Sequence, residues 1–191
     1  LVTLMVREFP ELQGVMGGLY AQATEAPAIA AAIRWHYHPV AIEADAAPAG
    51  KLSGTALDTF ALVALVDKLD TLIGYLGIGV TPSGSSDPYG LRRAGQGVIR
   101  ILLDFWTGKA PNLNDVVTDA HRLYGPALTK STKDLQAALR AFLLDRLRGV
   151  FLAREAGSAD EIEAVLEARA DPLSDVKDTA KRLHALAAVR S

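Results

Sequence analysis

Charged side chains able to act in catalysis or ligand binding gather in one stretch, DKLDTLIGYLGIGVTPSGSSDPYGLRRAGQGVIRIL. Asp67 and Asp70 are three residues apart, which places both carboxylates on one face of a helix and leaves Lys68 on another. A carboxylate inside an apolar helix requires a cationic partner or a metal ion, because burying its bare charge is costly. We expect an internal hydrogen bond or an ion pair with Arg92 or Arg93 rather than a metal site.

A glycine- and serine-rich connection separates these acids from the arginine pair. The segment GIGVTPSGSSDP lacks the lysine and hydroxyl of a phosphate-binding loop and follows no strand, so that motif is excluded. Asp87 followed by Pro88 predicts an N-cap, and the helix that follows offers amide groups to an anion where Asp87 does not occupy them. Arg92 and Arg93 lie just inside this helix, and Arg100 continues their rows. Two interpretations stay open, a phosphate-contacting surface and a solvated arginine face.

Two histidines lie in the segment HYHP. His36 and His38 fall on different faces of a helix, so together they make a poor metal pair. We expect each to be a helix-end histidine hydrogen-bonded to the chain, with one of them facing the core as the alternative. The chain also lacks cysteine and the G-x-S-x-G and H-E-x-x-H motifs. The residues by themselves predict no catalytic site and no metal site.

Composition predicts a folded domain with no general affinity for nucleic acid. Half of the 191 residues are hydrophobic and 22% are charged, which is enough apolar side chain for a core. The net charge of −2 means that a phosphate-binding surface requires local clustering of the 20 lysines and arginines. The longest apolar run carries charges near its centre, which predicts a core helix and no membrane span. Because cysteine is absent, we expect a reducing compartment, the cytoplasm by default.

Apolar residues recur at helical spacing along the chain, and no segment alternates as a strand does. The predicted fold class is all-α, a multi-helix bundle of roughly eight helices. The helix over Thr55–Leu76 is apolar nearly all round, which predicts a place at the centre of the bundle. Ser131 with Asp134 and Ser158 with Glu161 predict capped starts of two further helices. The remaining helices are expected near residues 1–19 with a break at Pro10, 27–38, 88–106, 113–125 and from Asp171 onward, with a loop over 40–53.

Four blocks of the sequence occur in one order: EFPELQGVMGGLYA, HYHP, the charged stretch quoted first, and FLLDRLRGVF. Together they resemble an internal portion of the β subunit of the bacterial heterotetrameric glycyl-tRNA synthetase, over nearly the whole chain. The chain also begins LVTLMVREFP, without an initiator methionine or signal peptide, which leads us to expect a piece of a longer protein. By this resemblance the amino-terminal domains and the anticodon-binding domain lie outside it.

The resemblance implies an HD-domain-like helical fold, related in shape to metal-dependent phosphohydrolases. Those enzymes hold metal ions with a His, a His-Asp dipeptide and a later Asp. No His-Asp dipeptide exists here: Glu8 and Glu11 lie where the dipeptide is expected, and His36 and Asp67 resemble remnants of later ligand positions. Trp35 also replaces the acidic residue that precedes the His-Tyr pair in the family motif. We therefore expect a decayed site that holds no metal.

By the same resemblance, residues 1–125 form the HD-like core and residues 126–191 a helical extension packed on it. The family charges glycine tRNA in an ATP- and Mg-dependent ligase whose α subunit activates glycine. The expected role of this portion is non-catalytic positioning of tRNA, with Arg92, Arg93 and Arg100 on its phosphates. Expected partners are glycine tRNA, the α subunit and other domains of the same β subunit. A structural scaffold and a live HD phosphohydrolase are the alternatives.

Overall fold

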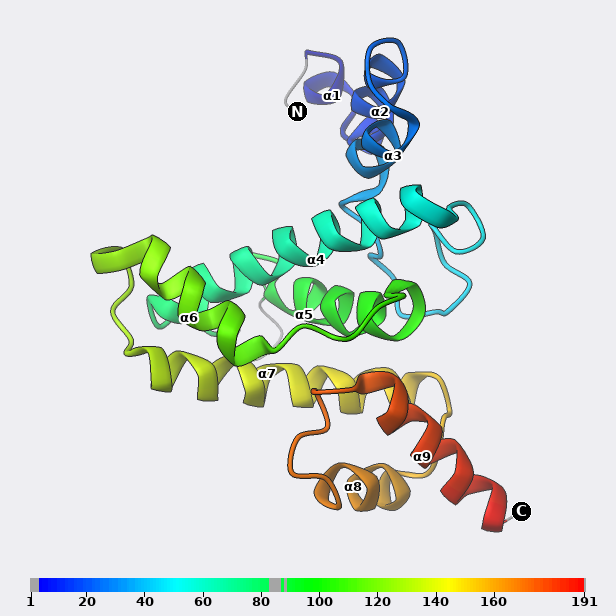
Figure 1. Ribbon diagram of the computed structural model, residues 1–191, viewed down its shortest axis with the longest axis vertical. Helices are drawn as coiled ribbons and strands as arrows, with labels where there is room; N and C mark the ends of the chain where they lie inside the picture. Colours follow the sequence, from blue (N-terminus) through cyan, green and yellow to red (C-terminus); the bar gives the residue numbers. More distant parts are fainter. Residues whose placement is uncertain (1–3, 83–86, 88, 191) are drawn as a thin grey trace.

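The computed structural model describes residues 4–82, 87 and 89–190, and within these it is all-helical, without a strand (Figure 1). The predicted all-α class is confirmed, with nine α-helices in the described residues where roughly eight were expected. They are α1 (Leu4–Glu8), α2 (Val15–Ala21), α3 (Pro27–Trp35), α4 (Gly54–Gly77), α5 (Leu91–Arg100), α6 (Leu113–Tyr124), α7 (Thr132–Ala153), α8 (Ala159–Glu167) and α9 (Val176–Arg190).

Helix α5 lies between α4 and α7, and these three helices form the centre of the molecule (Figure 1). The short helices α1 to α3 stand on the outer side of α4, while α8 and α9 lie beyond α7. One buried apolar cluster runs from Phe60 in α4 through Ile99 in α5 and Leu143 in α7 to Leu183 in α9. It thus continues across residue 125, and the expected division into core and extension there stays a prediction.

Helix α4 lies at the centre of the bundle, as its composition predicts, but it is not buried all round. Its inner face buries Leu65, Leu69 and Leu72, but Leu62 is 53% exposed and Val66 is 56% exposed. Helix α5 lies between α4 and α7, although its sequence looks less apolar. Small residues at the contact points of a helix allow the close packing that this position requires.

Two glycines let α5 approach both neighbours. A Cβ atom at Gly95 would come within 2.7 Å of a ring carbon of Phe142 on α7. A Cβ atom at Gly97 would lie 2.6 Å from Cε of Lys68 on α4. Glycine lowers helix propensity by about 1 kcal/mol relative to alanine, so these positions are explained by packing.

Two predicted helix starts are confirmed, and in both a side chain caps the first turn. Ser131 accepts a hydrogen bond from the Asp134 backbone N–H at 3.2 Å. Ser158 and Glu161 form a reciprocal capping box, with distances of 3.3 and 2.8 Å. Both motifs satisfy amide groups that a helix leaves without partners.

Two other starts shift along the chain. Helix α5 begins at Leu91, although the Asp87 carboxylate still caps it by accepting from the Arg92 N–H at 3.1 Å. Pro88, predicted as its first helical residue, lies outside the described residues. Helix α9 begins at Val176 rather than at Asp171, because the residues before it form turns, in which Asp171 accepts from the Leu173 N–H at 3.2 Å.

The loop between α3 and α4 contains cis peptide bonds before Pro39 and Pro48 and is held by buried cations. Lys68 donates to the carbonyl oxygen of His36 at 2.9 Å. Arg100, wholly buried, donates to the carbonyl oxygens of Ala41 and Ala44 at 2.8 and 3.2 Å. A loop without regular secondary structure thus has its carbonyl groups satisfied by side chains from the helices beneath it.

Asp104 joins two of the arginines that hold this loop. Its carboxylate accepts from Nε of Arg100 at 2.7 Å and from both terminal nitrogens of Arg154 at 3.0 and 2.7 Å. Arg154 in turn donates to the carbonyl oxygen of Ile42 at 3.1 Å. We call Arg100, Asp104 and Arg154 the loop clamp, because they tie the loop to the ends of α5 and α7.

Replacing Asp104 by alanine leaves two arginines, one of them fully buried, without their carboxylate. We expect Asp104→Ala to lower the free energy of unfolding by about 3–5 kcal/mol, the usual effect of breaking a buried ion pair from one side. Urea unfolding measures it. Asp119→Ala is the control, because its pair with Arg122 is largely exposed and is worth less than about 1 kcal/mol. Equal losses in the two variants would contradict the assigned role of the clamp.

Candidate nucleic-acid interface

The arginine pair lies at the start of α5, next to a glycine in the left-handed conformation. Gly90 has a φ of 67°, and a Cβ atom there would come 3.2 Å from a terminal nitrogen of Arg93. The guanidinium of Arg93 therefore folds back over Gly90, and the side chain is exposed. Arg92 is only half-exposed. Within the described part of the chain Arg93 forms no ion pair, so its charge is available to a ligand.

Arg100 does not belong to this surface. Its side chain has no exposed area, and its guanidinium is used by Asp104 and two loop carbonyl groups. The prediction that Arg100 contacts phosphate is therefore corrected. On α5 the row of residues that starts at Arg93 ends at Arg100. It runs from solvent into the core, because α4 and α7 cover α5 on two sides.

In α4 the two acids are exposed and the lysine is buried, which is the reverse of the prediction. Asp67 and Asp70 are exposed, and neither forms an ion pair with an arginine among the described residues. Lys68 instead lies on the face that packs against α5, only 6% exposed. Asp70 accepts a hydrogen bond from the Tyr124 hydroxyl at 2.9 Å. The prediction was wrong because a lysine with a long apolar stem can reach a carbonyl group through the core.

The surroundings of Lys68 disfavour its charge. Burial lowers the pKa of Lys68 from 10.5 to about 8, against a small opposing effect of Asp67. Burial, helped by the Lys68 charge, also holds the pKa of His38 below its ordinary value. His36 lies with Nδ1 3.0 Å from the carbonyl oxygen of Ile33, at the end of α3. The helix-end role predicted for His36 is thus confirmed.

Lys68 makes stability depend on pH in a defined window. Between pH 8 and 10.5 the unfolded chain binds more protons at this site than the folded chain, so the free energy of unfolding rises with pH. Across the whole window the free energy of unfolding rises by about 3 kcal/mol. We expect Lys68→Met to remove this rise, whereas Lys133→Met, which changes an exposed lysine, keeps it. Urea unfolding from pH 7.5 to 10.5 tests this, and an unchanged slope in Lys68→Met would refute it.

The four positions expected to be remnants of an HD site do not form a donor cluster. Glu8, Glu11 and Asp67 are exposed, and His36 lines a groove of about 440 Å³ between α3 and α4. The walls of this groove are mainly apolar, including Ile29. In the described part of the chain no three His, Asp or Glu side chains gather as metal ligands. These residues therefore do not fit the metal ions of a phosphohydrolase.

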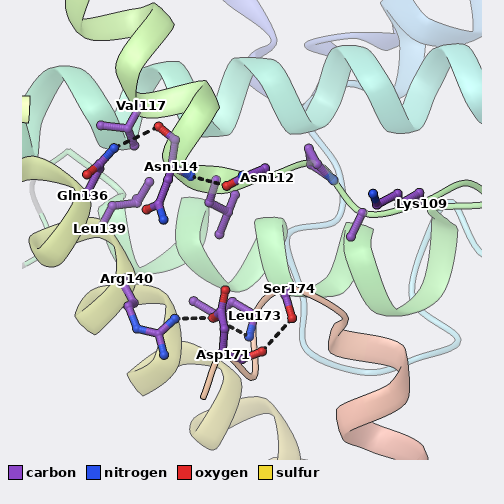
Figure 2. A pocket seen from close by; sticks show the side chains of 13 residues that line it. Lys109, Asn112, Asn114, Val117, Gln136, Leu139, Arg140, Asp171, Leu173 and Ser174 are labelled. Atoms are coloured by element: carbon purple, nitrogen blue, oxygen red, sulfur yellow. Dashed lines mark hydrogen bonds and ion pairs between the residues drawn. The ribbon is translucent and has the colours of Figure 1, made fainter. Parts of the chain in front are cut away.

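Another pocket, of about 550 Å³, opens at the start of α6 and was not anticipated from the sequence (Figure 2). Its polar groups mainly bond to one another: Asn112 accepts from the Asn114 N–H at 3.0 Å, and Gln136 donates to the Asn114 carbonyl at 3.1 Å. Arg140 pairs with Asp171 on the opposite wall (Figure 2). These contacts join α6 and α7 to the turn before α9.

An aromatic pair beside the arginines was also missed. Tyr75 of α4 and Tyr89 are stacked, with ring centroids 4.4 Å apart and an interplanar angle of 23°. Tyr89 is 51% exposed and directly precedes Gly90, over which Arg93 lies. The tyrosine next to the arginine pair was a usable signal, because aromatic rings among basic residues are typical of nucleic-acid surfaces.

Comparison with known proteins assigns this helical domain to the aminoacyl-tRNA synthetases. The family model described as the glycyl-tRNA synthetase beta subunit matches residues 1–167. The chain therefore belongs to the glycyl-tRNA synthetase β-subunit family, as the four sequence blocks indicated.

The relatives are glycine–tRNA ligase β subunits. That of Aromatoleum aromaticum is 46% identical over 168 residues, which cover 87% of this chain and 22% of the relative. That of Acidithiobacillus ferrooxidans is 42% identical over 189 residues, covering 98% and 25%. That of Desulforudis audaxviator is 42% identical over 193 residues, covering 100% and 26%. The chain thus spans about a quarter of the length of these relatives.

Proposed function

We propose that the chain is a tRNA-positioning part of a glycine–tRNA ligase β subunit and catalyses no step by itself. The observation that supports this most directly is Arg93, an exposed guanidinium with no carboxylate partner among the described residues, next to the exposed ring of Tyr89. A guanidinium binds phosphate oxygens in a planar, two-pronged geometry. Arg92, half-exposed, supports the same surface.

In this proposal the assembled ligase works in the cytoplasm with glycine tRNA, the α subunit and other domains of the β subunit as partners. ATP and Mg serve glycine activation on the α subunit. Among the described residues no three His, Asp or Glu side chains gather as metal ligands, and the sequence has no phosphate-binding loop. None of the described helices combines the length and apolar character needed to span a bilayer.

The salt dependence of tRNA binding tests the role of Arg93. Each phosphate contact releases bound cations, so losing one contact makes the plot of log affinity against log salt shallower by about one unit. We expect this change for Arg93→Ala in the full-length ligase, measured by fluorescence anisotropy with glycine tRNA.

Arg122→Ala is the matched control, because it removes another exposed arginine, one that is paired with Asp119 on α6. The proposal requires its salt slope to remain that of the unmodified ligase. An unchanged slope in Arg93→Ala, with normal folding, would contradict RNA contact at this surface.

A structural scaffold is the second candidate, and one observation favours it. Leu62, Val63 and Val66 form an exposed apolar stripe on α4, and Val63 also lines the 440 Å³ groove below α3. Such a surface fits contact with another folded domain. If Val66→Ser weakens association with the α subunit while Arg93→Ala leaves the salt slope unchanged, the scaffold role replaces RNA contact.

A further inference from the structure

A third pocket, of about 360 Å³, lies next to the tyrosine pair, between the second half of α4 and the end of α6. Tyr75 and Ile78 form its apolar side, and Tyr124 stands opposite. Asp70 supplies a carboxylate at its rim. A pocket lined by two tyrosines and aliphatic side chains, with a carboxylate at its rim, has the composition that small aromatic ligands require.

The aromatic wall is held in place by stacking. Tyr75 lines the pocket, and Tyr89 packs against it at 4.4 Å between ring centroids. Ile78, 47% exposed, extends the apolar surface by one helical turn. Because every nucleobase has a π-face, a tyrosine fixed in this way can stack a base of any type, typically for about 1–3 kcal/mol.

The carboxylate is held in one orientation. The Tyr124 hydroxyl donates to Oδ1 of Asp70 at 2.9 Å, and burial together with Asp70 raises the pKa of Tyr124, so this proton stays in place. The other oxygen, Oδ2, accepts no hydrogen bond from any described residue. It can accept from the exocyclic amine of adenine, cytosine or guanine, whereas uracil has no such amine and offers only its ring N3–H, which lies elsewhere on the base.

One exposed cation, Arg93, lies on the Tyr89 side of this pocket. Tyr89 connects the pocket wall to Gly90, over which the unpaired guanidinium of Arg93 lies. A phosphate next to a bound base would therefore find a cation on the Tyr89 side. Stacking combined with a nearby basic group is how proteins bind single-stranded nucleic acid.

We propose that this pocket binds one unpaired nucleobase of an RNA chain, with its ring against Tyr75 and its amino group donating to Asp70. The proposal rests on the proposed function, because the phosphate contact at Arg93 supplies the RNA. With this pocket, the surface around Arg93 binds an unpaired base as well as the phosphate backbone of the RNA.

The test compares the full-length ligase with its variants on equal-length RNAs: single-stranded oligoadenylate, single-stranded oligouridylate and a duplex. We expect Tyr75→Leu to weaken oligoadenylate binding about fivefold or more and to leave duplex binding unchanged. Tyr75→Phe, which keeps the ring, retains the affinity. Asp70→Asn, a surface change that does not depend on core packing, reduces the preference for oligoadenylate over oligouridylate.

The possible results distinguish failure of the base pocket from failure of the proposed RNA contact at Arg93. Loss of binding to both single strands and duplex in Arg93→Ala, with no effect of Tyr75→Leu or Asp70→Asn, overturns the base pocket alone. No RNA binding by the unmodified ligase, or no effect of Arg93→Ala on any RNA, overturns the proposed function and the pocket together.

Discussion

Asp104 is the residue on which the loop clamp depends. It binds Arg100 and Arg154, and both arginines reach past it to the carbonyl groups of the loop between α3 and α4. This loop leads from the outer helices into α4, so holding it sets how α3 meets the rest of the bundle. Arg100 and Arg154 thereby serve the fold, whereas Arg93 remains exposed beside an aromatic ring.

Much of the fold was predictable because it depends on local chemistry. The all-α class, the length of α4 and the capped starts at Ser131 and Ser158 follow from periodicity and capping residues. At the candidate site Arg92 and Arg93 were predicted, but the burial of the neighbouring charged residues was not, because periodicity tells which residues share a face but not which face meets another helix. Lys68 is buried rather than Asp67, since its partner is a carbonyl group in a loop 32 residues away. Arg100 was misassigned for the same reason, because it pairs with loop carbonyls 56 and 59 residues away.

The molecule keeps a helical body in which the positions expected for metal ligands are not assembled. Glu8 and Glu11 lie on the surface, and the groove beside His36 has mainly apolar walls. The polar chemistry open to a partner lies instead at the start of α5, where Arg93 and Tyr89 face solvent. This placement fits a domain that contacts a large charged partner better than one that acts on a small substrate.

Photo-crosslinking of glycine tRNA to the full-length ligase, followed by mass spectrometry of the peptides, tests the central claim that the start of α5 faces RNA. We expect a crosslinked peptide that contains Tyr89 to Arg93. Crosslinks within this chain that are confined to α8 and α9, or to the outer face of α2, would contradict this claim, because the bound RNA would then lie away from the start of α5 and from the neighbouring pocket.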